Sequence, residues 1–121
     1  MKKALLDSSF IITCVKQKID FFEDLTMLGL RILIPQQVTA EIKKLSSRDE
    51  NAKLTLKVLE NEKESFERLN LEKYGKTTDK KIINFANENR DVLVATLDKD
   101  IKQKIENGKI VIRGKKKIEV V

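Results

Sequence analysis

Four acidic residues, far apart in the sequence, have the type and the setting that metal-dependent chemistry needs. Asp7 and Asp98 each follow an apolar run, over residues 4–6 and 91–97, and a helical pattern comes after each of them. In an open parallel sheet, residues placed in this way stand at the carboxyl edge, where α/β proteins bind their ligands. We therefore expect these carboxylates to meet at that edge and to hold a divalent metal ion.

Glu41 and Asp79 stand on the inward faces of two predicted helices. Glu41 lies three residues after Val38, inside the apolar stripe of a helix predicted over residues 36–45, and Asp79 begins the stripe of a helix over residues 79–88. A surface carboxylate should lie on the opposite face of such a helix. A carboxylate within an apolar stripe must be desolvated or meet a cation, which makes both residues candidates for the same site.

Each acid also has an ordinary structural explanation. Asp7 and Asp98 could cap helices, and Asp79 could be favoured by the dipole of its helix. Two carboxylates ~5 Å apart, however, repel each other by about 3 kcal/mol at an effective dielectric constant of 20, so a fold without function has no reason to gather them. Mg²⁺ or Mn²⁺ turns that repulsion into coordination, lowers the pKa of a bound water and polarises a phosphate. Together the four acids therefore favour phosphodiester hydrolysis.

The composition excludes several other kinds of active site. The 121 residues include no histidine, which rules out Ser-His-Asp and Cys-His catalysis, paired-histidine cleavage of RNA and the usual zinc sites. Oxygen ligands remain, and they favour Mg²⁺ or Mn²⁺. Cys14 stands alone, so an internal disulfide is excluded. The 25 basic and 19 acidic residues give a net charge of +6, which fits a polyanionic partner and equally fits lysines that serve solubility.

The apolar patterns that must position the four acids alternate between strand and helix. We expect strands over residues 3–6, 31–34, 66–71, 92–97, 109–112 and 118–121, and helices over residues 8–15, 18–28, 36–45, 48–63, 79–88 and 99–106. Ser8 or Ser9 is expected to cap the first of these helices, and Thr77 or Thr78 the fifth. The alternation predicts an α/β fold with a mainly parallel sheet. We expect a single domain over residues 1–121, because we find neither a linker nor an internal repeat.

The uncharged stretches are too short for a membrane span. The longest, at residues 8–15 and 32–41, are about half as long as the ~20 residues that a membrane helix requires. Asp7 also interrupts the apolar run near the start of the chain too early for a signal peptide. We therefore expect a cytoplasmic protein.

Four motifs, in this order, resemble those of the PIN-domain ribonucleases. They are Leu5-Leu6-Asp7-Ser8-Ser9-Phe10-Ile11-Ile12, Pro35 with Val38-Thr39-Ala40-Glu41-Ile42, Thr78-Asp79 with Ile82-Ile83, and Val94-Ala95-Thr96-Leu97-Asp98-Lys99-Asp100-Ile101-Lys102. The match covers essentially the whole chain. The stretches over residues 16–22 and 112–117 are more similar to the ribosomal-RNA-processing branch of the family than to its toxin branch.

The resemblance implies a five-stranded sheet of order 3-2-1-4-5 and a Mg²⁺- or Mn²⁺-dependent endoribonuclease, with processing of rRNA or other RNA as the favoured role. The residues that match the acidic, metal-binding quartet of the family are Asp7, Glu41, Asp79 and Asp98. Thr96 matches a hydroxyl that often steadies the quartet, and Asp100 matches an additional acid. Many relatives have Asn where Ser9 stands, so the hydrogen bond that orients Asp7 is a weaker expectation here.

Basic and aromatic residues near the motifs are candidates for RNA binding. They are Lys76, Lys80, Lys99, Lys102, Arg113, Lys115, Lys116 and Tyr74. The basic side chains could contact phosphates, and Tyr74 could stack on a base. About half of the basic residues are expected to be ordinary solvated surface.

Two other functions stay open, each with its own partners. One is a toxin-type RNase silenced by an antitoxin, and the other is a non-catalytic RNA-binding or scaffold module. RNA is the expected partner in the first reading, together with ribosome-assembly proteins, and a homodimer formed through the helix over residues 18–28 is left open. A phosphoacceptor receiver domain is disfavoured, because Asp7 has no paired acid beside it.

Overall fold

The computed structural model describes residues 2–114 and 116–121, and strands and helices alternate along them. The elements are β1 (Lys3–Leu6), α1 (Ser8–Lys16), α2 (Phe21–Met27), β2 (Arg31–Pro35), α3 (Gln36–Leu45), α4 (Glu50–Asn61), β3 (Glu67–Leu69), the 3₁₀ turn η1 (Glu72–Tyr74), α5 (Thr78–Glu88), β4 (Leu93–Ala95), α6 (Lys99–Lys104), β5 (Lys109–Arg113) and β6 (Lys117–Val120). The predicted α/β class with a mainly parallel sheet is confirmed.

The strands form a six-stranded sheet of order β3-β2-β1-β4-β5-β6. The pairings from β3 to β5 are parallel, and Leu5 of β1 lies between Leu33 of β2 and Val94 of β4. This is the order expected for the first five strands. The sixth strand pairs antiparallel with β5, because the few residues between them can form a hairpin but not a crossover. The five-stranded sheet implied by the resemblance is thus extended by one antiparallel edge strand.

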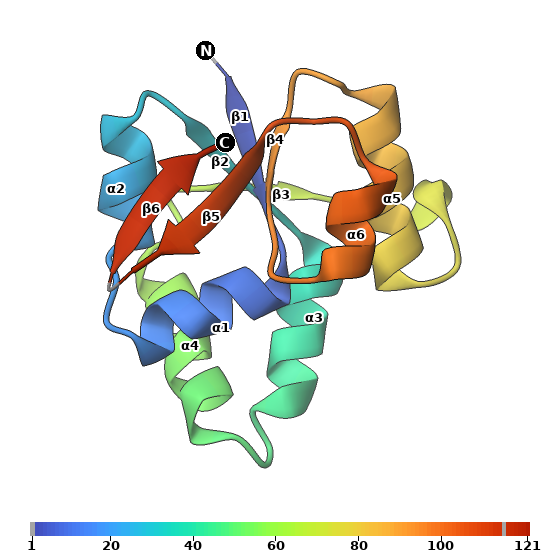
Figure 1. Ribbon diagram of the computed structural model, residues 1–121. Coiled ribbons are helices and arrows are strands. Elements are labelled where there is room, and N and C mark those ends of the chain that lie inside the picture. The colour runs from blue at the N-terminus through green and yellow to red at the C-terminus, as the bar shows by residue number, and fades with distance from the viewer. Residues whose placement is uncertain (1, 115) are drawn as a thin grey trace.

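Helices cover the two faces of the sheet in separate groups (Figure 1). Helices α1, α3 and α4 pack against one another, and α5 packs against α6 and η1. The central strands lie between these groups, and their apolar residues, Ala4 to Leu6 in β1 and Val94 and Ala95 in β4, are almost completely buried. This burial explains why both strands are continuous apolar runs, and it fixes where they end.

Several local predictions were wrong in detail. Of the expected N-caps of α1, Asp7 is the one observed, not Ser8 or Ser9, because its side chain accepts the N–H of Ser8. Three elements are shorter than expected: α4 covers 50–61 rather than 48–63, β3 covers 67–69 rather than 66–71, and α6 covers 99–104 rather than 99–106. Helix α2 begins at Phe21 rather than at residue 18, after Lys18 turns the chain with a left-handed φ of 61°. The strand expected over residues 92–97 is paired only from Leu93 to Ala95.

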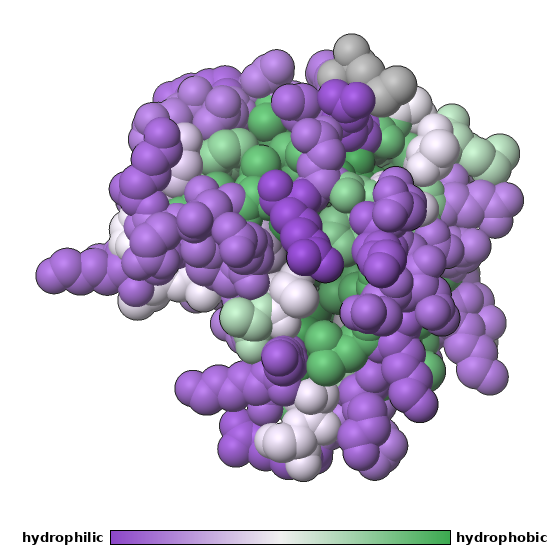
Figure 2. Space-filling model, turned by 180° about the vertical axis from the view of Figure 1, so that it is seen from behind, coloured by the Kyte–Doolittle hydropathy of each residue, from purple (hydrophilic) through white to green (hydrophobic). Residues whose placement is uncertain are grey.

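The surface is mainly hydrophilic where the molecule is seen from behind, and hydrophobic side chains show between the polar ones (Figure 2). Among the residues that the structure describes, no helix is both long enough and apolar enough to cross a bilayer.

Candidate active site

The four acids predicted from the sequence line one open pocket at the carboxyl edge of the sheet. The pocket has a volume of ≈ 330 Å³ and is lined by Asp7, Ser8, Ser9, Glu41, Asp79, Leu97 and Asp98. These residues come from the junction of β1 with α1, from α3, from the start of α5 and from the junction of β4 with α6. Elements distant in sequence therefore bring the acids together.

Asp7 is the most deeply placed of these acids, with a residue exposure of 5%. Its backbone N–H donates to the carbonyl of Ala95, and its carboxylate accepts the N–H of Ser8 at 2.8 Å and the Thr96 hydroxyl at 2.7 Å. Burial raises the pKa of Asp7 above its ordinary value, and the charges of Glu41 and Asp79 raise it further, against the lowering effect of the two hydrogen bonds. A cation in the pocket would stabilise the ionised carboxylate and so lower this pKa against both causes.

Two hydroxyls connect Asp7 to the end of β4. The Thr96 side chain is buried, donates to Asp7 and accepts the backbone N–H of Asp98 at 3.1 Å. The Ser9 hydroxyl donates to Asp7 Oδ2 over a longer 3.4 Å and accepts the N–H of Leu97 at 3.2 Å. The ends of β1 and β4 are therefore tied together at the pocket, beyond the last paired residues.

Asp98 and Asp79 lie at the starts of two helices. Asp98 is the N-cap of α6 and accepts the N–H groups of Asp100 at 2.8 Å and Ile101 at 3.3 Å. Asp79 lies in the first turn of α5, whose cap is Thr77. Partial burial raises the pKa of Asp79, and so do the negative charges of Asp98 and Glu41 and a hydrogen bond with Asp98. The ordinary capping explanation thus holds for Asp98, while its carboxylate also faces a second acid.

Glu41 is half-buried on α3 and accepts a hydrogen bond from the Ser8 hydroxyl. Ser8 itself is only 8% exposed. From the sequence Ser8 was considered only as a helix cap, so its place in the pocket was missed. One feature of the sequence could have predicted this place: Ser8 directly follows the candidate metal ligand Asp7 at the start of a helix.

Asp100 stands beside the pocket rather than in its lining. Its side chain is exposed and pairs with Lys104 at 3.2 Å, four residues along α6. Its charge still contributes to the raised pKa of Asp79. Asp100 therefore influences the pocket through its negative charge rather than through direct contact.

None of the basic candidates among the described residues lines the acidic pocket. Those on the surface of the described chain are Lys76, Lys80, Lys99, Arg113 and Lys116, with Lys102 half-buried. Arg113 already pairs with Glu119 at 2.9 Å. Lys115 lies outside the described residues.

Tyr74 is half-buried and held by its neighbours. Its ring meets Phe85 edge-to-face with centroids 5.3 Å apart, and Lys73 Nζ lies 5.3 Å from its centroid. Asn84 also donates to its carbonyl. The contact with Phe85 of α5 thus covers part of the Tyr74 ring, which was predicted to stack on an RNA base.

The donor set of the pocket fits a hard divalent cation. Carboxylates and hydroxyls are the ligands that Mg²⁺ and Mn²⁺ prefer, and the sequence offers no histidine to compete. Within residues 2–114 and 116–121, however, no three acidic or cysteine side chains stand close enough to hold one ion as they are placed. Side chains of the more exposed acids would have to rotate to complete a coordination shell.

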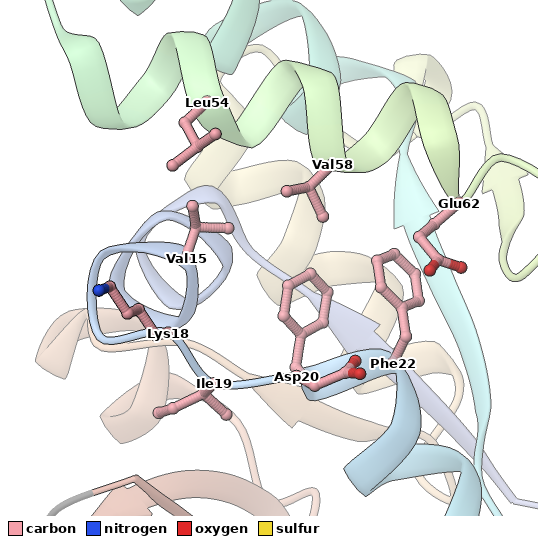
Figure 3. A pocket seen from close by; sticks show the side chains of 9 residues that line it. Val15, Lys18, Ile19, Asp20, Phe22, Leu54, Val58 and Glu62 are labelled. Atoms are coloured by element: carbon pink, nitrogen blue, oxygen red, sulfur yellow. The ribbon is translucent and has the colours of Figure 1, made fainter.

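A second pocket, of ≈ 340 Å³, has a different character (Figure 3). Leu54 and Val58 reach from α4 toward Val15 and Phe22, with the carboxylates of Asp20 and Glu62 beside them. Its described lining residues all differ from those of the acidic pocket. The apolar lining makes this pocket unsuited to phosphodiester chemistry.

Comparison with known proteins agrees with the fold and with the sequence motifs. The family described as "PIN like domain" matches residues 4–117. The rRNA-processing protein fcf1 of Schizosaccharomyces pombe is 36% identical over 104 residues, which are 84% of this chain and 52% of that protein. Ribonuclease VapC4 of Methanocaldococcus jannaschii is 33% identical over an alignment of 134 residues, which covers 99% of this chain and 97% of that protein. The chain thus spans about half the length of fcf1 and nearly all of VapC4.

Comparison with solved structures also finds PIN-domain proteins. The PIN domain endonuclease Utp24 superposes with a TM-score of 0.80 at 31% identity, covering 98% of this chain and 90% of that one. VapBC2 from Rickettsia felis, bound to a DNA fragment from its promoter, reaches a TM-score of 0.63 at 16% identity, over 88% of this chain and 98% of that one. The second likeness concerns the fold alone.

Proposed function

Because the chain belongs to the PIN-like domain family, whose relatives include nucleases, we propose that it is a Mg²⁺- or Mn²⁺-dependent endoribonuclease. The observation that carries this proposal is the pocket in which Asp7, Glu41, Asp79 and Asp98 face one another. Carboxylates that line one pocket repel one another, as their raised pKa values indicate for Asp7 and Asp79, and a divalent cation is the simplest group that makes their proximity favourable.

Each of the four acids has a role in this proposal. Asp7 and Asp98 would be the principal metal ligands, and Glu41 and Asp79 would complete the shell directly or through water. When bound, the ion supplies Lewis-acid chemistry, by which a water becomes acidic and charge on a phosphate is neutralised. Thr96 and Ser9 orient Asp7, and Lys80 and Lys99, next in sequence to two of the acids, would hold RNA phosphates by charge.

We further propose that the substrate is a precursor RNA, with rRNA processing as the favoured role. The support is the identity to fcf1 and the superposition on Utp24 over nearly the whole chain. Since fcf1 is about twice as long as the aligned region, the partners of that protein are not carried over.

A toxin-type RNase is the second candidate, because VapC4 aligns over 97% of its own length. A small DNA-binding protein encoded in the neighbouring reading frame would favour this candidate. Its absence would favour RNA processing.

The test is cleavage of 5′-labelled single-stranded and hairpin RNA with MgCl₂ or MnCl₂, and with EDTA. We expect metal-dependent cleavage that leaves 5′-phosphate and 3′-hydroxyl ends. Asp7→Asn should abolish it, whereas Asp91→Asn, an exposed acid in the loop before β4, should leave it intact. Full activity of Asp7→Asn would refute the assigned site, and RNA binding without cleavage in either metal would identify a non-catalytic module.

A further inference from the structure

Ser8 stands between two acids of the pocket and donates a hydrogen bond to each. Its backbone N–H donates to Asp7 Oδ1 at 2.8 Å, and its hydroxyl donates to Glu41 Oε1. The second bond joins residues 33 positions apart and links the start of α1 to the middle of α3. One small residue therefore touches both carboxylates.

Glu41 depends on this single contact more than Asp7 and Asp98 depend on any one of theirs. Asp7 accepts three hydrogen bonds from the protein, and Asp98 is held by the first turn of α6. Within the described parts of the chain, Ser8 is the one donor that reaches the Glu41 carboxylate, and no lysine or arginine pairs with it. A glutamate side chain has three rotatable bonds, and ordering it costs up to about 2 kcal/mol of entropy.

We propose that Ser8 is a positioning residue, whose hydroxyl holds the Glu41 carboxylate in the pocket beside Asp7 before a metal ion arrives. This inference rests on the proposed function for its consequence, because a fixed Glu41 matters only if the pocket binds a cation. A hydroxyl bonded to an ionised carboxylate is a charge-assisted contact, stronger than one between neutral groups. Without it, repulsion from Asp7 and Asp79 favours rotamers in which Glu41 points into solvent.

The position of Ser8 allows this role to be separated from a structural one. Ser8→Ala removes the hydroxyl and keeps the backbone N–H that donates to Asp7, because Ser8 is the first residue of α1 and alanine is favourable there. Ser8→Thr restores the hydroxyl. Ser47→Ala is a matched control on the surface, where the serine hydroxyl donates to the Lys44 carbonyl far from the acids.

The first measurement needs no metal. In the metal-free protein, side-chain NMR of Glu41 should show a single rotamer with resolved Cγ protons in the wild type and in Ser8→Thr. In Ser8→Ala these signals should average. An averaged Glu41 in the wild type, or an unchanged one in Ser8→Ala, would overturn the proposal, whatever the enzyme does.

The second measurement is Mn²⁺ binding in the absence of RNA, by calorimetry or by EPR of the free ion. We expect Ser8→Ala to weaken Mn²⁺ binding about 10- to 100-fold, the range seen when a ligand loses its orienting partner. Ser8→Ala should have no further effect in a Glu41→Ala background, because the two residues act as one unit. Equal effects of Ser8→Ala in both backgrounds would overturn the proposal.

These outcomes distinguish the inference from the proposed function. If the wild type binds no Mn²⁺ and cleaves no RNA, the nuclease proposal fails, while the NMR result still decides whether Ser8 holds Glu41. If Ser8→Ala lowers only the melting temperature, with Glu41 ordered and Mn²⁺ affinity unchanged, the role of Ser8 is structural and the positioning role is excluded.

Discussion

Thr96 Oγ1 donates a 2.7 Å hydrogen bond to Asp7 Oδ2, across 89 positions of the chain. The same oxygen accepts the N–H of Asp98 at 3.1 Å, so one buried hydroxyl is linked to two acids of the pocket. A β-branched residue suits a strand end for packing alone, but valine would serve that purpose equally well. The hydroxyl therefore has a polar function that packing does not explain.

Thr96→Val should impair the site more than its small change in volume suggests. The substitution removes one of the three hydrogen bonds that Asp7 accepts and leaves the Asp98 N–H without its partner, which costs about 1–3 kcal/mol of unfolding free energy. It also raises the pKa of Asp7 further, because the hydrogen bond that lowers this pKa is lost. We expect Mn²⁺ affinity to fall about 10- to 100-fold by calorimetry, with recovery in Thr96→Ser. Equal affinity in the valine variant would contradict this role.

Asp7→Asn should stabilise the metal-free protein or leave its stability unchanged at pH 7. Burial raises the pKa of Asp7, so the ionised carboxylate weakens the folded state at neutral pH. The folded protein takes up this proton at a higher pH than the unfolded chain, whose pKa is 3.8. Relative to Asp7→Asn, the wild type should therefore gain stability as pH falls from 7 and level off below about 3.8. Urea denaturation in EDTA measures both effects, and a strong loss of stability in Asp7→Asn at pH 7 would contradict them.

Metal removal should destabilise the wild type more than variants that lack one of the pocket carboxylates. Mn²⁺ at 100 times its dissociation constant stabilises a folded protein by about 2.7 kcal/mol. We expect a higher melting temperature for the wild type in MnCl₂ than in EDTA, a smaller difference for Asp79→Asn and none for Asp7→Asn. Asp91→Asn should behave as the wild type. A Mn²⁺ effect that persists in Asp7→Asn would place the ion elsewhere.

Cys14 should be unreactive in the folded protein. Burial, followed by the charge of Asp24, raises the pKa of its thiol to about 12. Iodoacetamide at pH 8 should modify it only after denaturation, as intact-mass spectrometry can check. Because the pKa of the unfolded thiol is 9.0, Cys14 contributes stability that is complete below pH 9 and is lost as pH rises toward 12. Fast labelling of native protein would show that the α1 region opens.

Asn107→Asp should be among the most destabilising single-atom changes in the chain. The Asn107 amide is 2% exposed and donates to the carbonyls of Ala86, Asn89 and Val92, at 3.1, 2.9 and 2.8 Å. Aspartate would place a buried carboxylate against three carbonyl oxygens, at a cost of about 3 kcal/mol or more. Chemical denaturation should detect this loss, and Asn61→Asp at the exposed end of α4 should change stability by less than about 1 kcal/mol. A small loss at Asn107 would mean that these contacts contribute little.

Periodicity was sufficient to predict most of the fold. The bounds of β1 and α3 agree with the prediction, because Lys3 and Asp7 mark the ends of β1, and Pro35 and Ser46 flank α3. The start of α2 was predicted too early, since the apolar pattern continues through the left-handed turn at Lys18. The apolar periodicity also does not predict that the last strand pairs antiparallel. That direction follows only from the short connection between β5 and β6.

The types of residue in the site could be predicted, but their contacts could not. The carboxyl-edge rule was enough to nominate Asp7 and Asp98, and the placement of Glu41 in an apolar stripe was enough to nominate it. The bond from Ser8 to Glu41 depends on how α3 is rotated against α1, which no local pattern encodes. The roles assigned to these residues stay predictions.

The pairing of β1 with β4 has a consequence for the newly made protein. Leu5 acquires its neighbour Val94 only after most of the chain has been synthesised, and Thr96 and Asp98 follow a few residues later. A nascent chain that stops before β4 has Asp7 and Glu41 but lacks the strand that closes the pocket around them. The site of the proposed nuclease can therefore assemble on the ribosome only after β4 and Asp98 have been synthesised.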